Sequence, residues 1–128
     1  MKKTNLIKIQ KISGTHIVGD LYECDFDYFI NKKPHKDLEN FFKQKVLDFG
    51  LNVIGSQIHS FKNNSFSLII MLSESHLCIH TWPENNYVSL DIFVCNYTRD
   101  NSIIAKNLFD EIIEYFKSQN KKINIINR

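Results

Sequence analysis

Two different periods of apolar and polar residues run along this chain, and they predict which segments are strands and which are helices. The period of two is clearest from Tyr87 to Cys95. Its polar side carries Tyr87, Ser89 and Asp91, and its apolar side carries Val88, Leu90 and Ile92. Because successive side chains of a strand point to opposite faces, this stretch predicts a strand with one wet and one dry side.

Five further segments are predicted to be strands, because each contains an apolar run that ends near turn-forming residues. They are Ile12–Cys24, Leu51–Phe61, Phe66–Leu72, Leu77–Trp82 and Lys121–Asn127. Gly19 interrupts the first of them, and we expect a β-bulge there. The residues Lys62–Ser65 and Pro83–Asn86 are predicted to form turns between consecutive strands.

Two segments have the helical period instead. The first begins at Pro34, which a first helical turn tolerates, and it ends at Gly50, which can adopt the left-handed conformation that stops a helix. Its apolar face carries Leu38, Phe42, Val46 and Phe49. The second follows Asp100, a suitable helix cap, and repeats apolar residues at Ile103, Ile104, Leu108, Ile112 and Phe116. Strands joined by tight turns, with two amphipathic helices, predict an α+β two-layer sandwich with a mostly antiparallel sheet.

The composition indicates one folded domain that covers residues 1–128. Hydrophobic residues make up 43% of the chain, which is enough for an ordinary core and argues against disorder. The net charge of +2 is too small, and the lysines are too scattered, to indicate a nucleic-acid-binding surface. Met1–Gln10 is expected to be a frayed, solvated arm.

The location of the protein is predicted from its apolar runs and its cysteines. No apolar run approaches the roughly 18 residues of a membrane span. The N-terminal apolar stretches are broken by Lys, Gln and Gly, unlike those of a signal peptide. Cys24, Cys78 and Cys95 form no CxxC pair, and an odd number of cysteines suits a reducing compartment. We therefore expect a cytoplasmic protein that does not bind membranes.

The stretch from Leu72 to Glu84 concentrates the reactive side chains of the chain. It holds two hydroxyls, two imidazoles, a thiol and two carboxylates: Ser73, Ser75, His76, His80, Cys78, Glu74 and Glu84. A serine in a strained turn, such as Ser75, can attack the preceding carbonyl, that of Glu74, if a base takes its proton and donors stabilise the oxyanion. Elimination from the resulting ester cuts the chain and leaves a pyruvoyl group. This ketone forms a Schiff base with an amine and accepts the electrons of a breaking C–CO₂ bond.

The residues alone leave this chemistry conditional. Ser75 and His80 are five residues apart, so on one regular strand they point to opposite faces, and a turn near Ser75 is required if they are to cooperate. Taken by itself, a turn serine is most often only a turn former. His76, Cys78 and His80 would share a strand face, but no second pair of ligands accompanies them, so we expect no metal site.

The block Ser73–Glu84, followed by Asp91–Cys95, resembles the pyruvoyl-dependent S-adenosylmethionine decarboxylase family in its short prokaryotic form. The likeness begins at Gly14 and runs through the second predicted helix, and the long central motif is specific. It implies self-cleavage between Glu74 and Ser75 into a β chain, residues 1–74, and an α chain, residues 75–128. It also implies a homodimer with active sites near the subunit interface, and S-adenosylmethionine as the substrate, decarboxylated to supply spermidine and polyamine synthesis.

The resemblance assigns catalytic roles by position. Ser75 becomes the pyruvoyl cofactor, and Glu74 supplies the carbonyl that it attacks. His80 and Ser67 match residues that assist processing, and the serine is also implicated in the active site. Cys95 matches the cysteine that protonates the decarboxylated intermediate.

The resemblance also assigns substrate-binding residues. Glu84 matches the carboxylate that holds the ribose hydroxyls, Phe61 matches the aromatic residue that stacks on adenine, and Leu77 is placed with them. Because a small amino acid has neither ribose nor adenine, Glu84 and Phe61 favour a nucleoside substrate. Departures from the family pattern at Cys78, Asn63–Phe66 and Asn96–Arg99 bear on the choice of substrate more than on processing, and two alternatives stay open. One is the same chemistry on arginine or ornithine, and the other is an unprocessed, inactive homologue that serves as a regulatory subunit.

Overall fold

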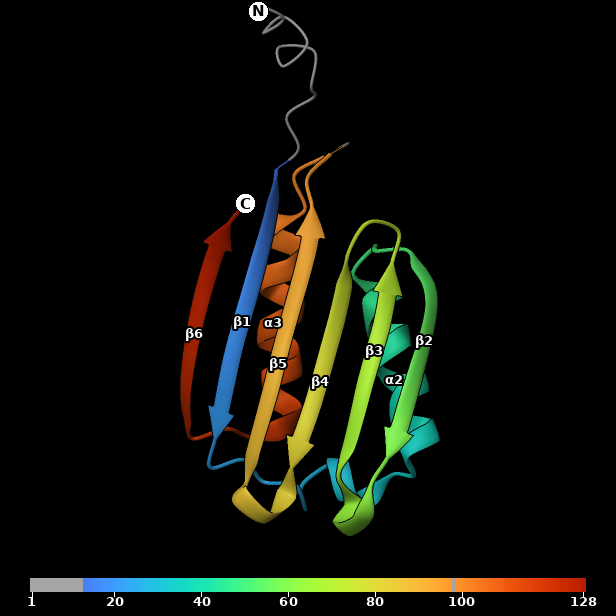
Figure 1. Ribbon diagram of the computed structural model, residues 1–128, viewed down its shortest axis with the longest axis vertical. Coiled ribbons are helices and arrows are strands. Elements are labelled where there is room, and N and C mark those ends of the chain that lie inside the picture. Colours follow the sequence, from blue (N-terminus) through green and yellow to red (C-terminus); the bar gives the residue numbers. More distant parts are fainter. Residues whose placement is uncertain (1–12, 98) are drawn as a thin grey trace, which may run out of the picture.

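The computed structural model describes residues 13–97 and 99–128, so the predicted arm Met1–Gln10 lies outside the described residues. The strands are β1 (Gly14–Tyr22), β2 (Val53–Ser60), β3 (Phe66–Leu72), β4 (His76–Trp82), β5 (Tyr87–Cys95) and β6 (Asn120–Asn127). The helices are α2 (His35–Asp48) and α3 (Ser102–Phe116), with short 3₁₀ turns η1 (Ile30–Lys32), η2 (Lys62–Asn64) and η3 (Pro83–Asn85). Figure 1 shows the strands side by side with the two helices behind them.

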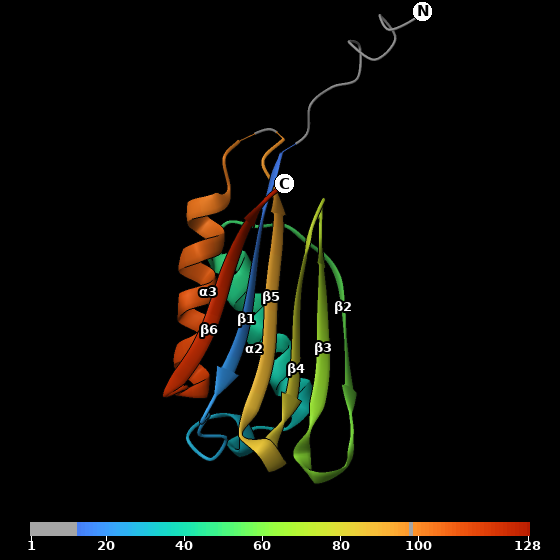
Figure 2. The same cartoon turned by 60° about the vertical axis from the view of Figure 1, so that its left-hand side comes forward.

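The strands form one six-stranded sheet in the order β2-β3-β4-β5-β1-β6, and every neighbouring pair is antiparallel. Both helices cover the same face of this sheet, α2 against β2 and β3, and α3 against β1 and β5 (Figures 1 and 2). The predicted two-layer α+β sandwich is therefore confirmed. The opposite surface of the sheet, which no helix of the described chain covers, is called the open face below.

The core lies between the helices and the covered face of the sheet. In β5 the burial alternates residue by residue, as the period of two predicted, with four buried side chains: Val88, Leu90, Ile92 and Val94. The predicted apolar face of α2 is buried at Leu38, Phe42 and Val46, and Phe49 packs against the core while partly exposed. Burial of each such side chain stabilises the fold by about 1.5–3 kcal/mol. The helices are therefore fixed by what they bury against the sheet.

The helix ends differ from the prediction by about one residue, as helix boundaries commonly do. Gly50 has a φ of 87°, so it stops α2 in the left-handed conformation as predicted. Pro34 lies just before the first helical residue of α2. Asn101, not Asp100, is the cap residue of α3, but Asp100 still holds this end because its Oδ1 accepts a hydrogen bond from the Ser102 N–H at 2.9 Å. Neither helix is long and apolar enough to cross a membrane, and the same is true throughout the described part of the chain.

The predicted bulge at Gly19 is wrong. β1 pairs with both β5 and β6 through this residue without a shift of register. Gly19 instead makes room for a helix side chain, because a Cβ atom there would lie 2.7 Å from Cζ of Phe109 in α3. The irregularity of the sheet lies in β2, between Val53 and Gly55.

Candidate active site

The predicted site residues form two groups at opposite ends of the sheet. The first group, Glu74, Ser75 and Cys95, lies where the β3–β4 hairpin meets the end of β5 (Figure 1). The second group gathers where the β2–β3 and β4–β5 turns approach each other, and it consists of Phe61, Ser67, His80 and Glu84. Each group lines its own cavity, and no residue lines both.

The first cavity, of about 330 Å³, places the predicted cleavage point beside the predicted proton donor. Ser75 lies between β3 and β4, and its carbonyl oxygen accepts a hydrogen bond from the Leu72 N–H at 2.9 Å. The backbone N–H of Cys95 donates to the Ser75 hydroxyl oxygen at 3.3 Å. The required turn at Ser75 is therefore present, and β5 holds the serine hydroxyl in place.

The electrostatics of the first cavity keep the Cys95 thiol protonated. Burial raises the pKa of Cys95, and the neighbouring Glu74 carboxylate raises it further, while a backbone hydrogen bond from Tyr97 acts in the opposite direction. Burial likewise raises the pKa of Cys24 and of Cys78 to about 11. A thiol with a raised pKa is a weak nucleophile at neutral pH, but it retains a proton that it can donate.

Replacing Glu74 with glutamine is expected to lower the pKa of Cys95, because the substitution removes a negative charge that disfavours the thiolate. Only the thiolate reacts with iodoacetamide, so the pH profile of Cys95 alkylation, followed by mass spectrometry of its peptide, reports this pKa. The midpoint should move to lower pH in Glu74→Gln. It should stay unchanged in Glu114→Gln, the same substitution at an exposed position of α3. Equal midpoints in the two variants would show that Glu74 does not act on the thiol.

The second cavity, of about 560 Å³, opens on the open face and is lined by hydroxyl, imidazole, carboxylate and aromatic groups. Ser67 on β3 and His80 on β4 are direct cross-strand partners, and the serine Oγ lies 2.7 Å from the His80 Nδ1. Phe61 is 53% exposed at the edge of the cavity. The cavity is also lined by Trp82, Glu84, Lys62, Ser65 and Thr81. A hydrogen-bonded Ser–His pair can move a proton, and the exposed ring and the carboxylate can hold a ligand.

The two groups do not meet within one chain. Ser75 precedes β4 and His80 lies five residues further on, a separation of about 16 Å at the rise of an extended strand. The turn that Ser75 and His80 need in order to cooperate is present, but it does not bring the His80 imidazole to Ser75. Leu77 lines neither cavity, because its side chain is fully buried on the helix-covered face. This side chain offers no surface for contact with a ligand.

Asn101 and Arg99 also line the first cavity, where the sequence did not predict them. The Oδ1 atom of Asn101 is buried without a hydrogen-bond partner among the described residues, while its Nδ2 donates to the Cys95 carbonyl oxygen at 3.0 Å. The Arg99 guanidinium donates to the Gly50 carbonyl oxygen at 2.9 Å. A buried acceptor without a partner beside Ser75 suits a ligand that carries a hydrogen-bond donor. No sequence motif marks either residue, since only the folded loop places them there.

A second omission concerns the open face. The strand pattern groups His76 with Cys78 and His80, because all three share a face. In the structure His76 instead joins His16 and Asp91, whose side chains come from β1 and β5. The period of two can predict that His16, His76 and Asp91 each lie on the polar side of a strand. It cannot predict that β1 pairs with β5, because the pairing of distant strands does not follow from the local sequence.

Comparisons with known proteins point to one family. The family model for S-adenosylmethionine decarboxylase matches residues 15–128. An S-adenosylmethionine decarboxylase proenzyme of Clostridium botulinum, strain Loch Maree, is 34% identical over 113 residues, which cover 88% of this chain and 94% of that protein. A proenzyme of the same name from Fervidobacterium nodosum is 33% identical over 109 residues, covering 85% and 74%. The crystal structure of the adenosylmethionine decarboxylase from Aquifex aeolicus has a TM-score of 0.75 and 26% identity, with 91% of each chain covered.

Proposed function

Because this chain belongs to the S-adenosylmethionine decarboxylase family, we propose that it is a self-processing, pyruvoyl-dependent decarboxylase of S-adenosylmethionine. Its product would be the aminopropyl donor for spermidine and other polyamines. The observation that carries the proposal is the cavity that brings Glu74, Ser75 and Cys95 together. It combines a serine held in a turn, the carbonyl that precedes it, and a thiol that retains its proton.

Processing begins at the Glu74–Ser75 peptide bond. The Ser75 hydroxyl attacks the Glu74 carbonyl carbon, its proton passes to a base, and the amide becomes an ester with a free Ser75 amine. Elimination across the Ser75 Cα–Cβ bond then releases Glu74 as the new carboxyl terminus of the β chain, residues 1–74. Hydrolysis of the remaining enamine releases ammonia and leaves a pyruvoyl group at the start of the α chain, residues 75–128.

The pyruvoyl group, once formed, supplies an electron sink for decarboxylation of an amine-bearing substrate. The residues around it hold and orient the reactants. Cys95 donates a proton to the substrate carbon that has lost CO₂, and the Glu74 side chain helps to keep the thiol protonated until that moment. The buried Oδ1 of Asn101 offers an acceptor for a substrate N–H.

The substrate class is inferred from the second cavity. A volume of about 560 Å³ with an exposed aromatic ring and a carboxylate suits a nucleoside, since Phe61 can stack on a base and Glu84 can accept two ribose hydroxyls. Arginine and ornithine have neither a base for Phe61 nor ribose hydroxyls for Glu84. These features favour S-adenosylmethionine over a basic amino acid.

Both cavities can serve one reaction if the protein is a homodimer. The open face exposes apolar side chains along β3 and β4, including Ile69, Met71 and Trp82, which are 48%, 53% and 39% exposed. Such a patch is suited to contact with a second copy of the chain. In a two-fold dimer every contact between two different regions is made twice, once in each direction, so the first group of each subunit can face the second group of the other. We propose that the active site is composite in this way.

Purified protein is expected to release CO₂ from S-adenosylmethionine labelled at the carboxyl carbon, and not from arginine or ornithine. Glu84→Gln should raise KM about ten- to hundredfold with a smaller change in kcat, because a hydrogen bond to a charged group contributes about 1.5–3 kcal/mol. The measurement is steady-state kinetics with the processed enzyme, and the processed fraction is determined by mass spectrometry.

The matched control is Glu114→Gln, which should leave both constants unchanged because this glutamate is exposed on α3, the helix layer. Release of CO₂ from arginine or ornithine instead would contradict the proposed substrate. An unchanged KM in Glu84→Gln would remove this carboxylate from the substrate site.

A further inference from the structure

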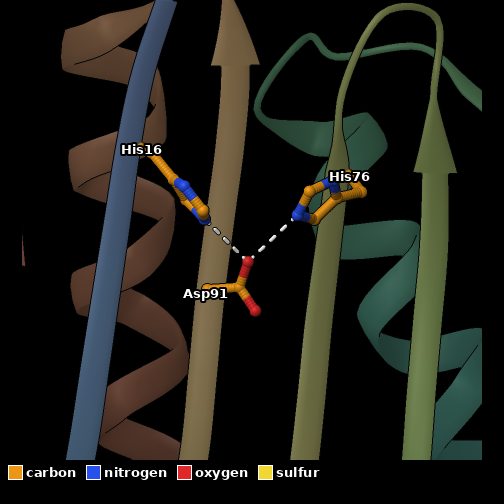
Figure 3. A group of neighbouring side chains, drawn as sticks. All are labelled: His16, His76 and Asp91. Carbon is orange, nitrogen blue, oxygen red and sulfur yellow. Dashed lines mark hydrogen bonds and ion pairs between the residues drawn. The ribbon is translucent and has the colours of Figure 1, made fainter. Parts of the chain in front are cut away.

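We propose that His16, His76 and Asp91 bind a divalent transition-metal ion on the open face of the sheet. Figure 3 shows the two imidazoles approaching one carboxylate from either side. His16 Nε2 lies 2.9 Å from Asp91 Oδ2, and His76 Nε2 lies 3.0 Å from the same oxygen. All three potential ligand atoms lie within 4.8 Å of one another. The proposal goes beyond the decarboxylase activity and does not depend on it.

The register of three strands builds this cluster. β5 lies between β1 and β4, and both His16 and His76 pair directly with Phe93 of β5. Asp91 lies two residues before Phe93 on the same face, so each imidazole reaches it diagonally. The Phe93 ring packs against both imidazoles, with ring centroids 5.5 and 5.9 Å away. The cluster is thus assembled from rigid strands and not from loops.

The donor set indicates which ion it would hold. Two imidazole nitrogens and one carboxylate oxygen suit Zn²⁺, Co²⁺ or Ni²⁺, whereas Mg²⁺ and Ca²⁺ prefer sites made of oxygen ligands. The N–O distances of 2.9 and 3.0 Å are hydrogen-bond distances, and each would lengthen by about 0.4–0.5 Å around a tetrahedral ion. The two nitrogens would approach to about 3.4 Å on a tetrahedral ion with bonds near 2.1 Å, which small side-chain rotations supply. Three protein ligands leave a position for water or another ligand.

The charge around Asp91 also favours a cation. Among the described residues, its ion-pair partners are the two imidazoles, which carry a positive charge only when protonated. Lys122 lines a neighbouring cavity of about 330 Å³ that also includes His16 and Asp91, but it forms no ion pair with the carboxylate within the described chain. The three side chains are 20–37% exposed in the single chain, so an ion can enter before a second copy covers the open face.

The test measures binding of Zn²⁺ alone to protein without an affinity tag. Isothermal titration and elemental analysis after dialysis should find one Zn²⁺ per chain, and Co²⁺ should give a d–d absorption band. His16→Gln should weaken Zn²⁺ binding by more than about tenfold, because it removes a ligand. Zn²⁺ should raise the Tm of the wild type and not that of His16→Gln.

Two controls separate the cluster from its surroundings. Asp91→Asn is compared with Asp20→Asn, the same change at a carboxylate that lines the same neighbouring cavity but lies outside the cluster. His16→Gln is compared with His59→Gln on β2, where the histidine is exposed. Equal loss in a variant and its control, or no Zn²⁺ binding by the wild type, would overturn the proposal. The uncleaved Ser75→Ala chain should bind Zn²⁺ as well as the wild type, so the result is independent of processing.

Discussion

Replacement of Ser75 by alanine is expected to leave the chain in one piece and to abolish decarboxylation. Without the hydroxyl there is no nucleophile for the Glu74 carbonyl and no source of the pyruvoyl group, so both effects should be complete. Denaturing intact mass spectrometry of the wild type should show two species that divide at Glu74/Ser75. The species containing residues 75–128 should lack a free amino terminus. Ser75→Ala should show one species with the mass of the whole chain.

Ser73→Ala is the matched control, because it removes a hydroxyl from the same turn and lines the same cavity. It should still be cleaved. Cleavage of Ser75→Ala at the same bond would contradict the proposed mechanism. A wild-type chain that stays intact on incubation, and that is active only with a partner protein, would favour the regulatory-subunit alternative.

Most of the fold could be predicted from the sequence because the signals are local. The period of two in Tyr87–Cys95 appears in the structure as strict alternation of burial along β5. Gly50 ends the first helix in the left-handed conformation, as predicted from its position after the last apolar residue of the helix. The prediction of a bulge at Gly19 is wrong because the reason for a glycine at this position is not local. The ring of Phe109, ninety positions further along the chain, occupies the space where a side chain would be.

The sequence indicates which reactive residue types the candidate site contains, but not how the fold arranges them. Glu74 and Ser75 are neighbours in sequence, and the prediction that both lie in a break between two strands is confirmed. The resemblance places Leu77 with the substrate, but the alternation of β4 turns its side chain into the core. His16 and Asp91 are 75 positions apart and meet only through the β1–β5 pairing. Pattern reasoning gives the face of each residue, and register decides which residues share a site.

The separation of Ser75 from His80 predicts complementation between two inactive variants. Ser75→Ala and His80→Ala should each remain uncleaved when expressed alone, the second because it lacks the imidazole of the Ser67–His80 pair. When the two are co-expressed, the intact His80 of one chain can serve the intact Ser75 of its partner. Only the His80→Ala chain should then be cleaved. Intact mass spectrometry can identify it, because its α chain contains position 80 and so has the mass of the substituted fragment.

Statistics set the size of this effect. Equal expression of the two chains gives about half mixed dimers, each with one composite site that is wild type and one that lacks both groups. About a quarter of all chains should therefore be cleaved, with decarboxylase activity at or below that fraction of the wild type. Co-expression of His80→Ala with a Ser75→Ala/His80→Ala double variant should give no cleavage, because neither chain then offers an imidazole. If Ser75 were served by His80 of its own chain, every mixed dimer would stay uncleaved. Cleavage in the His80→Ala chain therefore locates the two halves of the site on different subunits.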